Sequence, residues 1–438
     1  MAARVSQTGL SVKLGRWTLL YCSNTMRMFL IRIGVAMSSS FIKKTDQPAI
    51  SRANRGTSSE RARLLSIDAL RGLMVLFMLL DHVRETFFLH HQVPDPMIIG
   101  STPPDLFFSR VLAHLCAPVF VFLTGLSAFL YASGKGDNAR SAASGFLWRR
   151  GLFLVLLEVT VINFAWTFQF PPAKVFLQVI WILGLSMLAL SGLLWLPRRW
   201  LIALGVAVVA GHNLLDAVHF SGGPLQVIWA VLHERAWIVI SETMKARTSY
   251  PLLPWIGLIA LGYAAGPWFL AQIQAAWRLR NILRVGVGLL VFFFVLRALN
   301  FYGDKPWITG ESPLLTLMSF FNVTKYPPSL LFCSLTLGVG FLLLAALERV
   351  QHARWLTWIA VFGSAPMFFY IVHLYVLKFL YLGGEAIWGL NQGKFFGFAS
   401  MGAVWVTAIV LALLLHPLVR AFANLKARRR DITWLKYL

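Results

Sequence analysis

The chain has 438 residues, of which 58% are hydrophobic and only 13% are charged, and its mean hydropathy is +0.68. A soluble domain carries about 25% charged residues, so the composition excludes an ordinary soluble protein. The formal net charge of +23 would suggest nucleic-acid binding in a soluble protein. Here the basic residues stand at the ends of apolar runs, as in the cytoplasmic loops of membrane proteins. We therefore expect no nucleic-acid partner.

Residues 1–63 are rich in Ser, Thr and Arg and show no clean apolar period. This composition predicts a disordered, basic cytoplasmic arm. Residues 64–424 hold the apolar runs and are predicted to form one transmembrane domain. Residues 425–438 are predicted to be a basic cytoplasmic tail.

Ten apolar windows of roughly 20 residues follow the arm, and this is the length that a helix needs to cross the hydrocarbon core. We therefore predict an all-α polytopic membrane protein with about ten transmembrane helices. The expected spans are 67–88, 106–132, 146–168, 174–196, 200–219, 250–271, 282–300, 327–348, 358–382 and 400–422. The segment 220–249 is predicted to form an interfacial or re-entrant helix.

Lys and Arg are concentrated in one set of loops, which includes GKGDNARSAASGFLWRR, WRLRNILR and KARRR. The opposite loops, such as HHQVPDPMIIGSTPPD and GGEAIWGLNQGK, are rich in Pro, Gly and aromatic residues. Because basic loops stay on the cytoplasmic side, both termini are predicted to be cytoplasmic.

The first span carries ionisable residues that a simple anchor does not need. Arg71 and His82 are eleven residues apart, so they return to nearly the same helix face about 16 Å apart along the axis. Ionisable groups at membrane depth indicate a function by default. Asp81 precedes His82, and Asp68 stands one turn before Arg71. A structural alternative remains, in which Arg71 reaches the headgroups and Asp68 caps the helix.

The second span adds Arg110 and His114, which share a helix face because they are four residues apart. They are expected to meet Asp81 and His82 in the outer half of the membrane. The loop between the two spans supplies further acid–base or metal-ligating groups: His90, His91, Asp95 and Asp105. Their spacing matches no metal template, so no metal site is expected.

Later spans contain fewer candidates. Arg149 and Arg150 open the third span, where they either anchor it to the cytoplasmic surface or hold phosphate. The same span carries Glu158 and Asn163. His373 lies between apolar residues in GSAPMFFYIVHLYVLKF, and both a structural and a functional role are open for it.

Several blocks resemble the catalytic-domain family of membrane-bound heparan-α-glucosaminide N-acetyltransferases, in particular its bacterial members. They are IDALRGLMVLFMLLDHVRETFF, HLCAPVFVFLTGLSAFLY and WRRGLFLVLLEVTVINFAW, followed by LQVIWILGLSMLAL, YPLLPWIGLIALGYAAG, TKYPPSLLFCSLTLG and GSAPMFFYIVHLYV. The resemblance covers residues 64–420. The Arg71-to-His82 interval also resembles a pattern at the first span of the wider membrane acyltransferase group.

The resemblance implies an acyltransferase in a bacterial-type inner membrane. Acetyl-CoA or another acyl-CoA would enter from the cytoplasm, and the acyl group would pass to a carbohydrate-like acceptor on the opposite face. A homodimer is compatible with this reading. The resemblance also implies an essential histidine near the outer end of the first span or in the loop after it, and His82, His90 and His91 are the candidates.

Site roles compatible with acyl transfer follow from the residue types. His82 or His91 would be the base, oriented by Asp81. His114 or Arg110 would face the developing oxyanion. Three arginines at the inner end would bind the CoA phosphates, namely Arg71, Arg149 and Arg150.

Two alternatives stay open at the level of the sequence. A transporter or exporter of a small or lipid-linked molecule would be expected to show broken helices or an internal repeat. A non-enzymatic scaffold would tolerate replacement of its intramembrane His and Arg residues.

Overall fold

The structure is a computed structural model, and it describes residues 55–88, 93–429 and 431–438. The described chain is mostly helical, as predicted. Its α-helices are α2 (Arg55–Phe87), α3 (Pro104–Ala113), α4 (Cys116–Ser133), α5 (Ala139–Leu157), α6 (Asn163–Thr167), α7 (Val179–Leu193), α8 (Arg198–Gly211), α9 (Gly223–Leu232), α10 (Leu253–Ala265), α11 (Ala275–Leu299), α12 (Pro313–Phe321), α13 (Leu330–Arg349), α14 (Arg354–Ser364), α15 (Pro366–Trp388) and α16 (Met401–Arg428).

A small sheet departs from the all-α prediction. Its strands β1 (Lys174–Leu177), β2 (Trp237–Val239) and β3 (Lys245–Thr248) are arranged in the order β1-β3-β2. β1 pairs with β3 in parallel, and β2 pairs with β3 in antiparallel orientation. The segment 220–249 therefore contains a ten-residue helix and two strands, where a single interfacial or re-entrant helix was predicted.

Five helical stretches among the described residues are long and apolar enough to cross a membrane: Pro104–Ser133, Ala275–Leu299, Leu330–Arg349, Pro366–Trp388 and Met401–Arg428. The other predicted spans coincide with helices that are shorter or more charged. α7, α8 and α10 have 15, 14 and 13 residues, and α2 carries the charged residues noted above. The predicted number of ten spans and the side of the termini remain predictions.

Three of the predicted spans are interrupted helices. A break at His114 and Leu115 separates α3 from α4. A π-helical turn, Glu158–Ile162, joins α5 to α6. Ala365 separates α14 from α15, because its backbone leaves the helical region just before Pro366, which has no backbone N–H to continue a helix.

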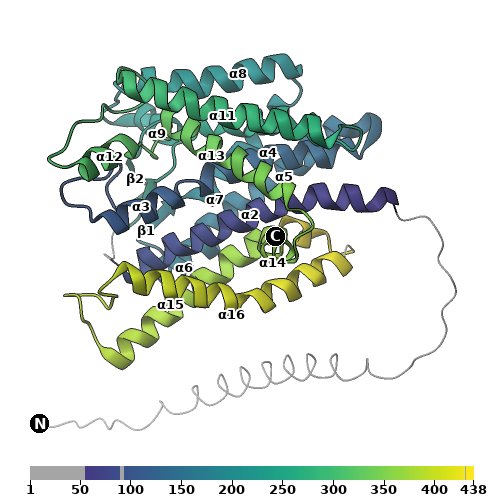
Figure 1. Cartoon of the computed structure of the whole chain (residues 1–438). Coiled ribbons are helices and arrows are strands. Elements are labelled where there is room, and N and C mark those ends of the chain that lie inside the picture. The colour runs from purple at the N-terminus through teal and green to yellow at the C-terminus, as the bar shows by residue number, and fades with distance from the viewer. Residues whose placement is uncertain (1–54, 89–92, 430) are drawn as a thin grey trace, which may run out of the picture. The chain divides into compact units, whose positions relative to one another are not determined.

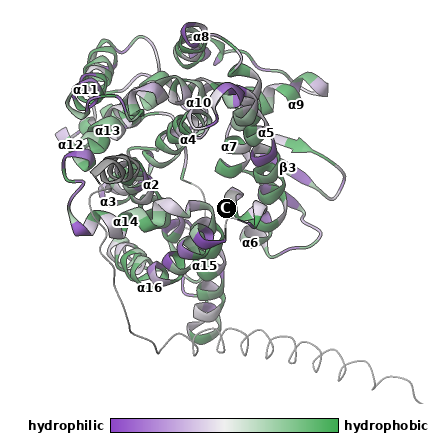
Figure 2. Ribbon diagram, turned by 90° about the vertical axis from the view of Figure 1, so that its right-hand side faces the viewer, coloured by the Kyte–Doolittle hydropathy of each residue, from purple (hydrophilic) through white to green (hydrophobic). Residues whose placement is uncertain are grey.

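α2 lies between two apolar cores, and it packs into both. Its N-terminal part, with Leu70 and Met74, belongs to a core built with α4, α7, α10 and α13. Its C-terminal part, with Leu79 and Val83, belongs to a core built with α14, α15 and α16. The ribbon shows the same arrangement, with α15 and α16 on one side of α2 and α11 and α13 on the other (Figure 1). The helices are seen nearly end-on in Figure 2, where β3 lies at the edge of the domain.

Close backbone contact fixes α2 against α14. A Cβ added to Gly72 would lie 2.0 Å from the Ile359 carbonyl oxygen, and one added to Gly363 would lie 1.8 Å from the Asp68 carbonyl oxygen. Only glycine allows two helices to approach this closely. The contact sets the position of α2, which carries Arg71 and His82, relative to the α14–α15 pair.

Candidate active site

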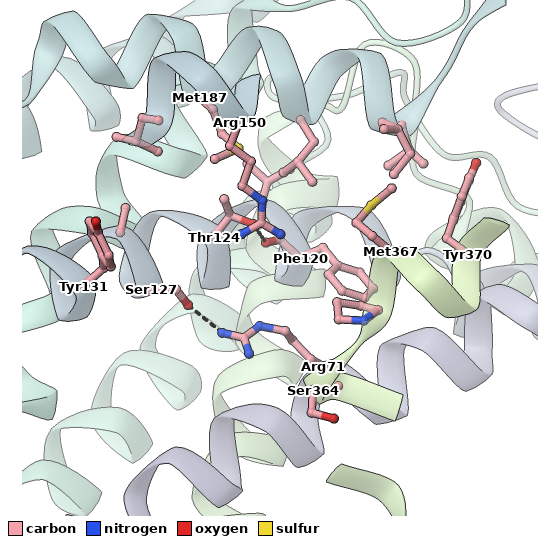
Figure 3. Close-up of a pocket in the computed structure, with 18 of the residues that line it drawn as sticks. Arg71, Phe120, Thr124, Ser127, Tyr131, Arg150, Met187, Ser364, Met367 and Tyr370 are labelled. Carbon is pink, nitrogen blue, oxygen red and sulfur yellow. Dashed lines mark hydrogen bonds between the residues drawn. The ribbon is translucent and has the colours of Figure 1, made fainter. Parts of the chain in front are cut away.

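A cavity of about 250 Å³ opens between α2, α4, α5, α7, α15 and α16, and we call it the basic cavity (Figure 3). Its lining includes three cations, Arg71, Arg150 and Lys426. Arg71 and Arg150 approach the space from opposite sides, while Tyr131 and Tyr370 lie at opposite ends of it. The cavity is therefore an elongated hollow with cationic side chains in its middle.

The cations in the basic cavity are only partly neutralised. Arg71 forms an ion pair with Asp68 and donates a hydrogen bond of 2.5 Å to Ser127 Oγ. Arg150 Nε is buried without a hydrogen-bond partner among the described residues. Planar guanidinium groups with free N–H donors suit phosphate oxygens. The arrangement fits an anionic ligand better than a neutral one.

The predicted phosphate-binding arginines separate in the structure. Arg71 and Arg150 line the basic cavity, whereas Arg149 is exposed and lies outside its lining. Lys426 does line it, although this residue belongs to the predicted basic tail. The run KARRR predicts a cytoplasmic segment, and nothing in its composition distinguishes the lysine that lines the cavity.

The rest of the basic cavity is apolar. Its lining includes the following side chains from α2, α4, α7 and α15: Met78, Phe120, Val179, Ile180, Leu183, Met187 and Met367. Cofactor and substrate sites in proteins are commonly apolar, with a few polar groups that fix the ligand. This lining suits the uncharged arm of a long ligand whose anionic end binds the cations.

His82 and His373 form a buried pair. His82 Nδ1 lies 2.7 Å from His373 Nε2, and the two rings stack with centroids 5.0 Å apart. His373 Nδ1 lies 2.8 Å from the Phe369 carbonyl oxygen, which can only accept a hydrogen bond. Neutral His373 therefore carries its proton on Nδ1, and its Nε2 accepts the proton of His82 Nδ1. These two hydrogen bonds leave His82 Nε2 unprotonated, and a general base must be unprotonated to accept a proton.

A second cavity, of about 270 Å³, lies beyond the histidine pair, and we call it the aromatic cavity. Its lining is Glu85, Thr86, Ala165, Trp166, Leu374, Lys378, Tyr381 and Phe395. On α2, Met78 lines the basic cavity and Glu85 lines the aromatic cavity, with His82 between them. On α15, Tyr370 and Leu374 line the two cavities in the same way, on either side of His373. The histidine pair thus lies in the wall between the two cavities.

Two aromatic donors flank His82. The Tyr370 and Trp166 rings lie edge-on to its imidazole, with centroids 5.7 Å and 5.3 Å away. The Tyr370 hydroxyl and the Trp166 indole N–H are buried, and apart from their contact with each other neither has a hydrogen-bond partner among the described residues. Leaving a buried donor poorly paired costs about 1–3 kcal/mol, so a substrate oxygen would stabilise this pair. Neither residue belongs to the site predicted from the sequence.

Among the described residues no hydrogen bond joins Asp81 to the imidazole of His82, and its orienting role stays a prediction. Its carboxylate accepts a hydrogen bond of 2.9 Å from Arg84 Nε, and the same guanidinium also pairs with Glu85. The side chain that is hydrogen-bonded to His82 is His373. In the sequence, His373 was visible only as a histidine between apolar residues. Nothing in the sequence connects it to His82.

Arg110 and His114 are buried in the region where α3 meets α4, close enough to Asp81 to interact with its charge, but no hydrogen bond joins either of them to His82 among the described residues. Arg110 Nη2 reaches the Val93 carbonyl oxygen at 3.5 Å. The His114 ring packs on Phe332, and both its nitrogens lack a partner among the described residues. Their predicted role at the oxyanion remains a prediction. His90 and His91 lie outside the described residues.

Other polar residues noted in the third span support the local fold. Glu158, which begins the π-helical turn, accepts a hydrogen bond of 3.0 Å from the backbone N–H of Trp181 at the start of α7. Asn163 bonds the Lys174 carbonyl and the Phe176 N–H of β1 through its side-chain amide. These contacts hold α6 and its Trp166 at the edge of the aromatic cavity.

No curated protein matches the chain. A family model described as heparan-alpha-glucosaminide N-acetyltransferase, catalytic, matches residues 63–303. The match includes α2 with Arg71 and His82 and α5 with Arg150, but it ends before α15 and His373. Because it spans more than half of the chain, the resemblance is confirmed: the protein belongs to the heparan-alpha-glucosaminide N-acetyltransferase catalytic family.

Proposed function

We propose that the protein transfers an acetyl or acyl group from cytoplasmic acyl-CoA to a carbohydrate-like acceptor of the glucosaminide type on the opposite face of the membrane. Family membership implies a transmembrane acetyltransferase. One observation carries the proposal for this chain: a hydrogen-bonded histidine pair lies between a basic and an aromatic cavity.

The basic cavity is the proposed donor site. Arg71, Arg150 and Lys426 would bind the phosphates of CoA, since charge-assisted contacts to phosphate are among the stronger hydrogen bonds in proteins. The apolar lining would hold the pantetheine arm, which reaches toward Tyr370 and places the thioester beside His82. The cationic loops of the chain would put this cavity on the cytoplasmic side.

The aromatic cavity is the proposed acceptor site. Trp166 and Tyr381 offer flat apolar faces, and Glu85 and Lys378 offer hydrogen-bonding groups. A sugar presents both apolar C–H faces and polar hydroxyl or amino groups, so this mixed lining suits it. A bacterial-type inner membrane, with this cavity facing away from the cytoplasm, is part of the same proposal.

The chemical step uses His82 as the base. Its Nε2 takes a proton from the acceptor amine or hydroxyl, and the acceptor then attacks the thioester carbonyl. The Tyr370 hydroxyl and the Trp166 indole N–H donate hydrogen bonds to the tetrahedral oxyanion. When the intermediate collapses, the C–S bond breaks, and the CoA thiolate takes the proton from His82.

The proposal is tested by replacing His82 with Asn in purified protein reconstituted into nanodiscs. Thiol release from acetyl-CoA in the presence of a glucosamine acceptor should fall about 10²–10⁴-fold, which is the usual contribution of a general base. His352→Asn, at an exposed position, is the matched control and should keep its turnover. Full donor-dependent turnover in His82→Asn would overturn the assignment.

A transporter would behave differently, and the comparison uses the same purified protein in nanodiscs and in sealed vesicles. If the protein is an acyltransferase, acetyl-CoA should raise the thermal midpoint of the wild-type protein. In a separate assay, acetylated product should form only when acetyl-CoA is present, and not with a neutral sugar alone. Movement of an acceptor into sealed vesicles without any release of CoA thiol would instead favour the transporter.

A further inference from the structure

A second group of histidines lies apart from both cavities described above. His212 begins a short 3₁₀ turn directly after α8, Asp216 follows that turn, and His233 lies directly after α9. One ligand atom from each of the three side chains lies within 4.8 Å of the others. None of the three lines the basic or the aromatic cavity.

The two imidazoles are buried but incompletely bonded. His212 is 2% exposed and His233 is 3% exposed. His212 has only a poorly aligned contact with the Pro328 backbone, and only one ring nitrogen of His233 has a hydrogen-bond partner among the described residues. Buried polar groups in proteins are nearly always well bonded, so two adjacent buried imidazoles with poorly bonded nitrogens indicate a missing ligand.

We propose that His212, Asp216 and His233 bind a divalent metal ion of the zinc type. Zn²⁺ prefers imidazole nitrogen and carboxylate oxygen, and with bonds of about 2.0–2.1 Å its tetrahedral ligand atoms stand about 3.3 Å apart. His233 Nε2 and Asp216 Oδ1 are already 3.0 Å apart. A nitrogen of His212 lies within 4.8 Å of both atoms, so coordination would require it to move closer to them.

A second layer of contacts orients the carboxylate. Asn213 Nδ2 donates a hydrogen bond of 2.9 Å to Asp216 Oδ2, the oxygen that does not face His233. Asn213 Oδ1 accepts a hydrogen bond of 2.9 Å from the backbone N–H of Leu330 at the start of α13. Such outer contacts fix the ligand geometry of metal sites in proteins. The proposed ion would join the end of α8 to the end of α9, on a carboxylate tied to α13.

The fourth coordination position is open. Asp216 and His233 line a cavity of about 330 Å³, together with Asp304, Lys305, Tyr326 and other residues. Three protein ligands with an open position are typical of zinc sites that hold water or an exchangeable ligand, whereas structural sites usually have four protein ligands. The ion would therefore carry a water molecule or an anionic oxygen ligand on its cavity side.

The alternative is an ordinary His233–Asp216 ion pair without metal. That reading accounts for two of the three side chains. It leaves His212 buried next to them without a well-formed hydrogen bond, and it gives no reason for the Asn213 contact on the second carboxylate oxygen. The metal site accounts for all four residues together.

The test measures metal binding by the full-length protein, independently of acyl transfer. Chelator-stripped protein in detergent is titrated with Zn²⁺ against a fluorescent chelator, and we expect one tightly bound equivalent per chain. Asp216→Asn and His212→Gln should each weaken binding at least 100-fold. His219→Gln is the matched control, because His219 lines the same cavity but is exposed and pairs with Glu234.

Cobalt replacement keeps the proposal falsifiable if a variant fails to fold. Wild-type protein loaded with Co²⁺ should show the visible absorption of a tetrahedral nitrogen–oxygen site. The proposal fails if wild-type protein binds no Zn²⁺ more tightly than the Asp216→Asn variant. It also fails if the Co²⁺ spectrum is that of the hydrated ion, or if His219→Gln loses the metal equally.

Discussion

At the scale of single residues, the chemistry of the candidate site depends on where protons reside. The Phe369 carbonyl holds the proton of His373 on Nδ1, and this in turn makes His373 Nε2 an acceptor for His82. We infer that His373 is a positioning residue, since it acts through His82 and not on the substrate. A tautomer fixed by a second group is a known way to prepare an imidazole for catalysis.

Replacing His373 with Leu should separate positioning from binding. We expect kcat to fall about 10²-fold while the KM for acetyl-CoA stays within a factor of two, because the donor cavity is intact. His373→Gln should recover part of the rate, since its amide oxygen can accept from His82 Nδ1. Adding His373→Leu to His82→Ala should lower the rate no further, because groups that act as one unit are not additive.

Tyr370→Phe removes one proposed oxyanion donor and keeps the ring. Loss of such a donor commonly lowers kcat about 10²–10³-fold, and we expect a value at the lower end because Trp166 remains. The measurement is steady-state thiol release, with Tyr263→Phe as the control, because Tyr263 lines neither cavity. Equal rates for wild type and Tyr370→Phe would remove Tyr370 from the chemical step.

Adjacent arginines on α5 provide a matched test of the donor site. Arg150→Gln should raise the KM for acetyl-CoA about 10–100-fold, because a hydrogen bond to a charged group contributes about 1.5–3 kcal/mol. Arg149→Gln should change it less than twofold, since that side chain is exposed and outside the cavity lining. The same change in both variants would indicate general attraction of an anionic donor and no specific site.

The sequence predicted individual site residues better than their partners. Arg71 and His82 were predicted to share one helix face. In the structure Arg71 lines the basic cavity, and His82 lies beside the end of that cavity where Tyr370 is. The partner of His82 is 291 positions away, and such a contact depends on how α2 and α15 pack. His212 and His233 come from separate helices, so no short motif joins them, and the expectation of no metal considered only the loop after the first span.

At the scale of helices and strands, glycine positions control how closely the site-bearing helices approach. Gly363→Ala places a methyl group 1.8 Å from a backbone oxygen of α2. Overpacking of this kind costs about 1–3 kcal/mol. It should also move α2 relative to α15. We expect a lower thermal midpoint and a rate loss larger than the stability loss explains.

Gly383→Ala is the control for that substitution. Gly383 lies on α15, and an added Cβ would meet nothing within 4 Å. Its thermal midpoint and turnover should equal those of the wild type or exceed them slightly, because alanine favours the helix. If Gly363→Ala behaves in the same way, close packing of α2 and α14 does not determine the site.

The sequence predicted where most helices lie, but it predicted their ends and interruptions less well. Apolar windows located α11, α13 and α16 well, because each is one long continuous run. The break at Ala365 and the π-helical turn at Glu158 were missed, since neither interrupts the apolar composition. The small sheet was missed because its strands have three or four residues and pair across long sequence separations.

At the scale of the whole molecule, the family and the five apolar helices identify an integral membrane protein. Its orientation is a prediction that single cysteines can test. Cys116 and Cys333 are buried, so Cys22→Ser gives a background for exposed probes. With a membrane-impermeant maleimide on intact bacterial cells, Ser221→Cys should react, and Ser133→Cys should react only after permeabilisation. The reverse labelling pattern would place the basic cavity on the side away from the cytoplasm and contradict the proposed orientation.

The sharing of α2 and α15 between both apolar cores limits the motions open to this protein. Swinging one core against the other, as carriers do to expose a site alternately to each compartment, would shear both helices and pull His82 from His373. We therefore expect the wall between the two cavities to stay in place during catalysis. The donor and the acceptor would enter from opposite sides, and only the acyl group would pass the two histidines. A barrier of this kind keeps the membrane sealed to ions during every turnover.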